Sequence, residues 1–346
     1  MVADPKFFVC RAACRATFAF RLLEGGVWAF IVLVGIAAPL AAQEEKAAPA
    51  EKDEAADEQA EELRRPFDIT GTELVTQDGV VLKASFFPGS KGKDSVPIIL
   101  LHSWKGDRRE FVPLALHLWL AGHAVLVPDL RGHGQSRQYV GGGSRELDAS
   151  KFVPADFALM ATSDMETLKG YLLKMNNAGK LNLEKLCVVG GEMGASVAFN
   201  WALIDWSWPI YPGLKQGQYV KALVLLSPQR NFKGLNIGAP LNSPLLNAGV
   251  SIMLLVGNED PKLLAEVQRM HATLERFHPP PAVGQEATEQ TLFFKGLDTK
   301  VQGTKLLGVR GLNVEQRIKK FIDLRLTARD YPWMESGKKP SSASGK

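Results

Sequence analysis

The chain has 346 residues, of which 46% are hydrophobic and 23% are charged, and its formal net charge is +4. These ordinary proportions exclude a wholly disordered chain, a collagen-like repeat and a coiled coil. Three cysteines without a CxxC pair exclude a disulfide-built scaffold and give no sign of a zinc site. We therefore expect neither a metal nor a cofactor.

The first 42 residues are typical of an export signal. A basic leader precedes an apolar run over residues 27–42, which ends in small residues suited to cleavage near Ala41 or Ala42. The run has 16 residues, whereas a spanning helix needs ~20. We predict a cleaved signal and a location in the periplasm or cell envelope. The alternative is an uncleaved anchor, in which residues 27–42 tether the chain to a membrane.

Residues 43–65 contain nine acidic and four basic residues and no aromatic residue. Such a segment buries too little apolar surface to offset its ordering entropy, so we predict a disordered acidic linker. A flexible tail is predicted over residues 331–346, which leaves one domain over residues 66–330. Residues 66–346 hold 33 basic and 26 acidic residues, a net charge of +7. The basic residues are scattered, which argues against nucleic-acid binding.

Apolar runs alternate with helical patterns along this domain. A hairpin is predicted around Asp78-Gly79, because an Asp-Gly pair between two apolar runs favours a tight turn. Further strands are predicted over residues 97–103, 123–129, 185–191, 220–227, 251–260 and 291–296. Helices are predicted over residues 109–122, 164–179, 192–204, 261–277 and 313–326. The order predicts an α/β fold, with a mostly parallel eight-stranded twisted sheet, helices on both faces and antiparallel first strands.

Residues 97–136 resemble the α/β-hydrolase family. The stretch Asp-Leu-Arg-Gly-His-Gly-Gln-Ser over residues 129–136 matches the family's Asp-x-Arg-Gly-His-Gly-x-Ser pattern. The resemblance extends over about residues 67–326. It is strongest to the lid-poor bacterial hydrolases, because the segment 228–249 is short for a cap domain.

The resemblance implies a catalytic serine at the centre of a Gly-x-Ser-x-Gly turn. Residues 190–194 match that turn at every position except the middle one, where Glu192 stands. The family's acid position falls on Asp260, which could also cap the following helix. Glu259 is the neighbour that could substitute for it.

The family's general base is a histidine after the last strand, and the resemblance places Gln302 there. A tighter alignment would place Asp298 or Thr299 at that position. No histidine follows His278, so the base is missing in either alignment. Glutamine cannot take up a proton at neutral pH.

An anion hole is still expected, because its donors belong to the main chain. The resemblance assigns them to the amides of Ser103 or Trp104 and of Met193. His102 and His133 match family positions that are usually structural.

We also expect Glu192 to lie beside Asp260, where repulsion would raise the pKa of one carboxyl group. Lys300 is then a candidate counter-charge.

Three hypotheses follow. The first is a catalytically degenerate hydrolase that binds a small-molecule ligand or a protein partner, neither of which the sequence identifies. The second is an active hydrolase of ester-, epoxide- or halide-type substrates with Glu192 as a carboxylate nucleophile. This hypothesis lacks a base, since His271 and His278 lie in or at the end of a helix. The third is an esterase that uses Ser103 or Ser196.

Overall fold

The computed structural model describes residues 65–143, 146–209, 211 and 214–336. In these residues no helix is both long enough and apolar enough to span a membrane. The predicted export signal, all but the last residue of the acidic linker, and residues 337–346 of the predicted tail lie outside the described residues.

An eight-stranded sheet forms the centre of the domain, with the strand order β1-β3-β5-β4-β7-β8-β11-β12. The strands are β1 (Phe67–Ile69), β3 (Lys83–Phe87), β4 (Pro97–Leu101), β5 (Ala124–Asp129), β7 (Leu186–Gly191), β8 (Val220–Leu226), β11 (Ser251–Gly257) and β12 (Leu292–Leu297). β3 pairs antiparallel with β1 and with β5, and every later pair is parallel. The predicted α/β fold with antiparallel first strands is confirmed.

Two small sheets lie at the rim of the domain. β2 (Val80–Val81) pairs with β6 (Gln138–Tyr139), and β9 (Asn231–Phe232) pairs with β10 (Leu235–Asn236).

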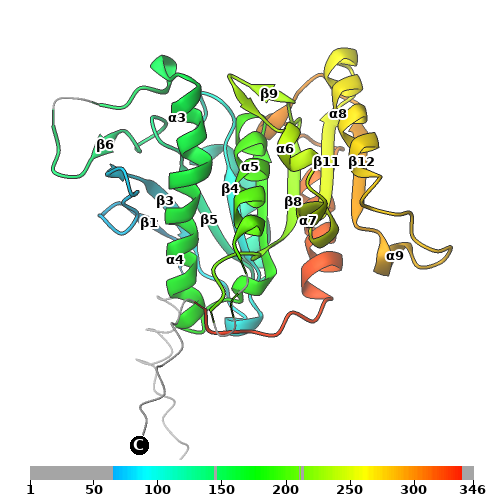
Figure 1. The fold of residues 1–346 in the computed structure, drawn as a ribbon, viewed down its shortest axis with the longest axis horizontal. Helices are drawn as coiled ribbons and strands as arrows, with labels where there is room; N and C mark the ends of the chain where they lie inside the picture. The colour runs from blue at the N-terminus through cyan, green and yellow to red at the C-terminus, as the bar shows by residue number, and fades with distance from the viewer. Residues whose placement is uncertain (1–64, 144–145, 210, 212–213, 337–346) are drawn as a thin grey trace, which may run out of the picture. The chain divides into compact units, whose positions relative to one another are not determined.

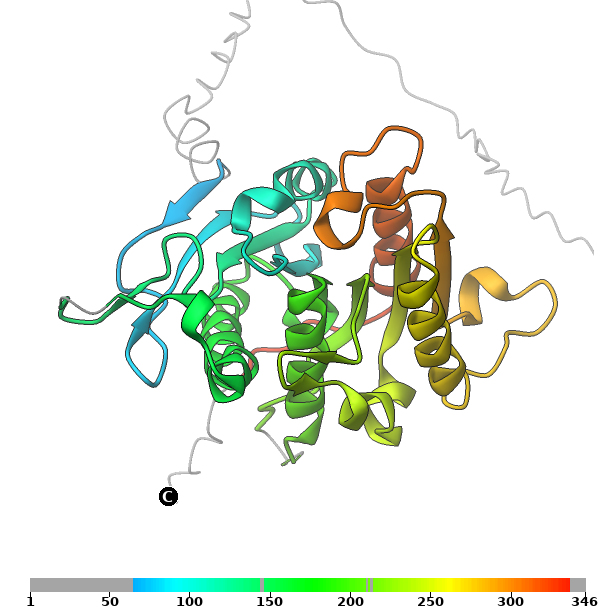
Figure 2. The ribbon, with the colours of Figure 1, turned by 90° about the horizontal axis from the view of Figure 1, so that it is seen from above.

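Helices cover both faces of the sheet (Figure 1, Figure 2). The helices are α2 (Val112–Leu120), α3 (Pro154–Leu159), α4 (Met165–Asn177), α5 (Met193–Ser207), α6 (Gly238–Leu241), α7 (Pro244–Gly249), α8 (Pro261–Leu274), α9 (Glu286–Glu289) and α10 (Val314–Ile322). Short 3-10 turns are η1 (Gly92–Asp94), η2 (Arg108–Phe111), η3 (Ala149–Lys151), η5 (Leu183–Lys185) and η6 (Gly303–Leu306), and π-helical turns are η4 (Met160–Asp164) and η7 (Asp323–Thr327).

Two apolar clusters form the core, one on each side of the sheet. Successive residues of β4 alternate between them: Ile99 packs with the cluster under α4, α5 and α8, and Ile98 packs with the cluster under α2 and α10. This alternation follows from the two-residue period of a strand. All five residues of β4 are buried, which explains why the strand reads as a continuous apolar run.

The helix predicted over residues 164–179 is α4, and a shorter helix and a π-helical turn that were not predicted precede it. Pro154 opens α3, and the side chain of Asp156 accepts a hydrogen bond from Val153 N at 2.9 Å. The turn η4 then joins α3 to α4. Asp164 directly precedes α4, and its buried carboxylate is bound to Arg131.

Residues 331–336 were predicted to belong to a flexible tail, yet they are bound to the domain. The amides of Asn176 and Asn182 donate to the carbonyl oxygens of Met334 and Tyr331, at 2.9 and 2.8 Å. The Lys93 ammonium lies 3.7 Å from the ring centroid of Trp333. The predicted boundary at residue 330 is therefore wrong for these six residues.

Candidate functional site

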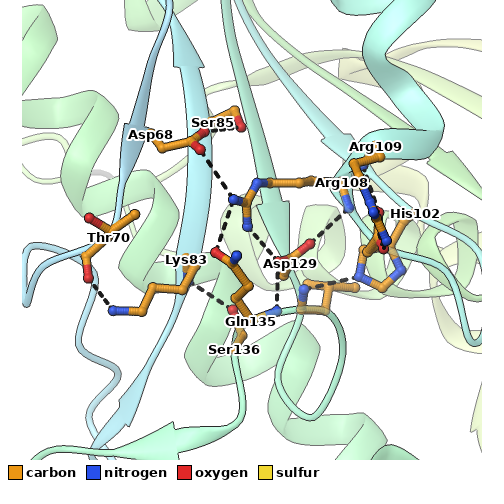
Figure 3. A network of polar contacts seen from close by, with 12 residues as sticks. Asp68, Thr70, Lys83, Ser85, His102, Arg108, Arg109, Asp129, Gln135 and Ser136 are labelled. Carbon is orange, nitrogen blue, oxygen red and sulfur yellow. Dashed lines mark hydrogen bonds and ion pairs between the residues drawn. The ribbon is translucent and has the colours of Figure 1, made fainter.

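The stretch 129–136, which carries the family resemblance, is a structural element beside the sheet. Asp129 accepts hydrogen bonds from Arg108 N at 2.8 Å, Arg108 Nη1 at 2.6 Å and Gln135 N at 2.9 Å. Figure 3 shows Arg108 also reaching Asp68 on the edge strand β1. Through Arg108, the Asp129 carboxylate therefore connects the turn after β5 to the first strands.

Arg131 of the same stretch joins two further segments. Its guanidinium donates to Asp164 Oδ1 at 2.8 Å and to both oxygens of Asp78, at 2.7 and 3.0 Å. Asp78 lies in the turn of the first hairpin, and Asp164 precedes α4. Burial raises the pKa of Asp164 to about 6, while the hydrogen bond from Arg131 holds the pKa of Asp78 well below its ordinary value.

Glu192 occupies a strained turn between β7 and α5. Its backbone has φ 45° and ψ −101°, a region that non-glycine residues rarely adopt. A Cβ at Gly190 would overlap the backbone of Gly194, and a Cβ at Gly194 would overlap the carbonyl of Leu101. The turn therefore needs both glycines, and the expected elbow is present with Glu192 at its apex.

The Glu192 side chain lies against the loop after the last strand. A Cβ at Gly303 would lie only 2.7 Å from Glu192 Cγ and 2.9 Å from Cδ. Gly303 also has φ +61°, so glycine is required there on two grounds. The two residues form a complementary pair, since the glutamate fits only because residue 303 has no side chain.

A second carboxylate faces Glu192, and it belongs to Glu110. Glu110 Oε2 accepts hydrogen bonds from Ser103 N at 3.0 Å and from Thr304 Oγ1 at 2.8 Å. Burial raises the pKa of Glu192, the nearby Glu110 charge raises it further, and Lys305 opposes both effects.

The charges that act on Glu192 therefore differ from the expectation. They come from Glu110 and Lys305 in place of Asp260 and Lys300. Glu110 lies in the segment predicted as the helix over residues 109–122. Nothing in its spacing marked it as a neighbour of the elbow, because only the fold brings η2 against η6.

Gln302, at the expected histidine position, is fully engaged in hydrogen bonds. Its Oε1 accepts from Ser227 Oγ at 2.6 Å and from Gly257 N at 3.0 Å, and its Nε2 donates to Gly257 O at 3.0 Å. Ser227 follows β8 and Gly257 ends β11. The glutamine thus joins the carboxyl ends of two neighbouring strands.

The other candidates for that position make local hydrogen bonds. Asp298 Oδ1 accepts from Asn258 Nδ2 at 2.6 Å, and Thr299 Oγ1 accepts from Val301 N at 3.3 Å.

Asp260 caps helix α8. Its Oδ1 accepts hydrogen bonds from Lys262 N and Leu263 N, both at 3.1 Å. Among the described residues, no hydrogen bond or ion pair joins Asp260 to Glu192 or Gln302. The three triad positions follow β7, β11 and β12, with β8 between the first two, and direct bonds do not link them.

The expected anion-hole donors divide into two groups. Ser103 N–H donates a hydrogen bond to Glu110 and is therefore not free to bind an anion. Trp104 N–H and Met193 N–H have no hydrogen-bond acceptor within the described ranges, and Met193 opens α5, where the helix dipole favours negative charge. Only Trp104 and Met193 therefore keep free donors.

The two candidate serine nucleophiles are both engaged. Ser103 Oγ lies 3.0 Å from Thr304 Oγ1. Ser196 is fully buried, and its Oγ lies 3.5 Å from the carbonyl oxygens of Glu192 and Gln229.

All six histidines lie in the described part of the chain, and none is hydrogen-bonded to Glu192, Asp260 or Gln302. His102 Nε2 accepts from Leu130 N at 3.0 Å, so its Nδ1 carries the proton and donates to Ser103 O at 2.8 Å.

The two histidines of this region are poor proton acceptors. His133 Nδ1 lies 3.0 Å from Arg131 O. Burial lowers the pKa of His102 and lowers that of His133 to about 4. Both histidines have the structural contacts expected of them.

The two later histidines lie at and near α8. His271 Nδ1 lies 3.6 Å from Glu275 Oε1. His278 Nδ1 lies 2.9 Å from the hydroxyl oxygen of Thr291. Over the described ranges, no group of three or more His, Cys, Asp or Glu side chains is arranged to hold a metal ion.

Comparison with known proteins gives one family and a set of distant structures. The profile of the alpha/beta hydrolase fold family matches residues 96–276. An esterase from Pyrococcus furiosus is similar with a TM-score of 0.50 and 18% identity, over 77% of this chain and 94% of that chain. An esterase from the fungus Rhizomucor miehei has a TM-score of 0.50 and 16% identity, over 80% of this chain and 89% of that chain. No curated protein matches significantly.

Proposed function

The chain belongs to the α/β-hydrolase family, and we propose that it is a member that binds its ligand without hydrolysing it. The observation that carries this proposal is the hydrogen bonding of Gln302. A general base must lie within hydrogen-bond reach of the proton that it removes and must have a free basic site. The amide of Gln302 has no basic site at neutral pH, and both its oxygen and its nitrogen are bonded to the ends of β8 and β11.

The surroundings of Glu192 support the same proposal. A serine at the elbow would need a partner that accepts its proton, whereas Glu192 has a carboxylate neighbour in Glu110 and a glycine contact in Gly303. No histidine is bonded to it in the described part of the chain. The elbow keeps its backbone shape and lacks the proton-transfer groups that hydrolysis uses.

The test is an esterase assay on the purified full chain with p-nitrophenyl acetate. We expect the wild type to release p-nitrophenol no faster than the same concentration of the Glu192→Gln variant. Turnover well above the uncatalysed rate that disappears in Glu192→Gln would overturn the proposal. A Glu192→Ser/Gln302→His variant that gains turnover would support the assignment of both positions.

A second function is favoured by one observation, the presence of two free amides beside a strained carboxylate. Trp104 N–H and Met193 N–H could hold the developing negative charge while a Glu192 oxygen attacks carbon. Opening of an epoxide C–O bond to an alkoxide, or loss of halide from a haloalkane, leaves a glutamyl ester, whereas attack on a carboxylic ester expels its alkoxide and leaves a mixed anhydride. With no base to activate water, the glutamyl ester would accumulate. Intact mass spectrometry after incubation with 1,2-epoxyhexane would detect an adduct, absent in Glu192→Gln, if this second function holds.

We also propose that the protein is exported. The support is in the sequence alone: a basic leader, the apolar run 27–42 and small residues at its end. Expression in a Gram-negative host should give a periplasmic product that lacks the first 41 or 42 residues. An intact N-terminus in the membrane fraction would support the anchor instead, and an intact soluble product in the cytoplasm would contradict both.

A further inference from the structure

A cleft of about 520 Å³ opens at the carboxyl ends of β4 and β5. The loop after β4, the turn after β5 and the start of η3 line it, and Glu192 does not. Its volume lies within the ~300–1,000 Å³ that is typical of small-molecule sites. The cleft is therefore large enough for a ligand and is separate from the elbow carboxylate.

Each acidic side chain of the cleft is bonded to the protein itself. Asp107 is paired with Arg109 at 2.6 Å, and Asp129 is paired with Arg108 at 2.6 Å. Asp148 accepts hydrogen bonds from the amide and hydroxyl of Ser150, at 2.9 and 2.7 Å. Two of the three carboxylates of the lining are thus paired with an arginine of the lining, and the charge of Asp148 is opposed by Lys151 at 3.9 Å.

Two basic side chains of the cleft have no such partner. Lys105 and Arg137 are both exposed, and neither side chain has a hydrogen bond or ion pair with any described residue. The guanidinium groups of Arg108 and Arg109 also line the cleft, but each is committed to an aspartate. The unpaired charge of the lining is therefore positive.

Lys105 is held in an unfavourable backbone conformation. Its φ is 62°, and it is one of six non-glycine residues with positive φ in the described chain, together with Glu192. Such backbone strain costs about 1 kcal/mol or more and is concentrated at active sites and ligand-binding segments. His133 adds no charge to this lining, because burial keeps its imidazole neutral at pH 7.

We propose that this cleft binds a small anionic ligand whose carboxylate or phosphate group lies between Lys105 and Arg137. The carboxylate and phosphate share the chemistry that these side chains recognise, namely oxygen atoms with negative charge. The proposal goes beyond the binding function above, since it names a ligand class and a location that do not involve Glu192. It holds whether or not the elbow is catalytic.

The test is isothermal titration of the full chain with three probes: inorganic phosphate, benzoate and the neutral benzamide. We expect saturable binding of phosphate or benzoate and none of benzamide. Whichever anion binds more tightly identifies the charged group of the ligand. Binding of neither anion, or equal binding of benzoate and benzamide, would overturn the proposal.

Variants locate the binding. Lys105→Gln and Arg137→Gln should each weaken anion binding about fivefold, which corresponds to an exposed charge pair of ~1 kcal/mol, and the double variant should weaken it further. Both side chains are exposed and unpaired, so unfolding temperatures should stay within about 2 °C of the wild type. A double variant that binds as tightly as the wild type would refute the assigned location.

Lys180→Gln is the matched control for charge. Lys180 is an exposed lysine that precedes β7. It therefore lies toward the amino ends of the parallel strands, whereas the cleft lies at their carboxyl ends. If it weakens binding as much as Lys105→Gln, the effect is one of net charge and the site is refuted. Glu192→Gln should bind the anion like the wild type, so failure of the cleft proposal and failure of the non-hydrolysing proposal give different results.

Discussion

At the scale of single residues, the position of the Glu192 side chain depends on the absence of a side chain at Gly303. A glutamate at the apex of the elbow needs space for its methylene groups, and the positive-φ glycine of the last loop provides it. The Glu110 carboxylate beside it, together with burial, raises the pKa of Glu192 above its ordinary value. The residue at the apex of the elbow is thus a partly buried carboxyl group without a hydrogen-bond partner among the described side chains.

The contact between Glu192 and Gly303 can be measured by a double-mutant cycle. Gly303→Ala should lower the free energy of unfolding by about 2 kcal/mol or more, because the new methyl group meets Glu192 and the backbone is strained. In a Glu192→Ala background the cost should be smaller, because only the backbone strain and the contact with Ser103 Oγ, 2.9 Å from the added Cβ, remain. Urea unfolding measures both values.

Gly308→Ala is the control for backbone strain alone, since Gly308 has φ +75° and nothing within 4 Å of an added Cβ. An equal cost of Gly303→Ala in both backgrounds would contradict the contact.

At the scale of elements, Gln302 determines how the last loop meets the sheet. It connects the residue after β8 with the last residue of β11, where a hydrolase of this family would hold its histidine. Ser227 supports the same connection, because its Oγ also accepts from Gly303 N at 2.9 Å. This arrangement fixes η6 beside the elbow and so positions Gly303 and Thr304.

Removing this connection should destabilise the protein through several lost hydrogen bonds. Gln302→Ala should lower the free energy of unfolding by about 2–3 kcal/mol, and Ser227→Ala by about 1–2 kcal/mol. Because the two side chains share a hydrogen bond, the double variant should cost less than the sum of the single variants. Strictly additive costs in urea unfolding would show that the bond does not form in solution.

At the scale of the whole molecule, Arg131 holds the first hairpin and the α3–α4 connection together. It binds Asp78 in the hairpin and Asp164 before α4, and the nearby Arg108 binds Asp129 and Asp68. These ion pairs attach the antiparallel edge of the sheet to its parallel part. Residues of the stretch that carries the family resemblance therefore hold the domain together.

The pH dependence of stability should report this connection. The pKa of Asp78 is lower in the folded state than its ordinary value of 3.8, so the folded state gains stability from its ionised form. That contribution is present above about pH 4 and is lost as the pH falls through the folded-state pKa. Thermal unfolding between pH 6 and pH 2.5 should show a smaller fall for Asp78→Asn than for the wild type.

Asp107→Asn is the comparison for Asp78, because Asp107 also has a lowered pKa but pairs only with the neighbouring, exposed Arg109. Its variant should follow the wild-type curve more closely. Identical curves for wild type and Asp78→Asn would contradict the role of the Arg131 network.

The sequence by itself determined the order of the strands and helices, because continuous apolar runs and helical periodicity record which faces are buried. It also identified the elbow from the spacing of Gly190 and Gly194, although the contact that requires Gly194, with the carbonyl of Leu101, exists only in the folded chain. It showed that no histidine follows His278, in the part of the chain where the family resemblance implies a general base.

Only the tertiary structure decided what surrounds Glu192. Glu110 and Lys305 are distant from it in sequence, and the parallel strands bring their loops to one edge of the sheet. The same holds for Gln302, whose partners come from β8 and β11, and for the cleft between Lys105 and Arg137. Hydrophobic periodicity specifies the helices and strands. Contacts between loops depend on how those elements pack together, and a single sequence carries no local signal for these contacts.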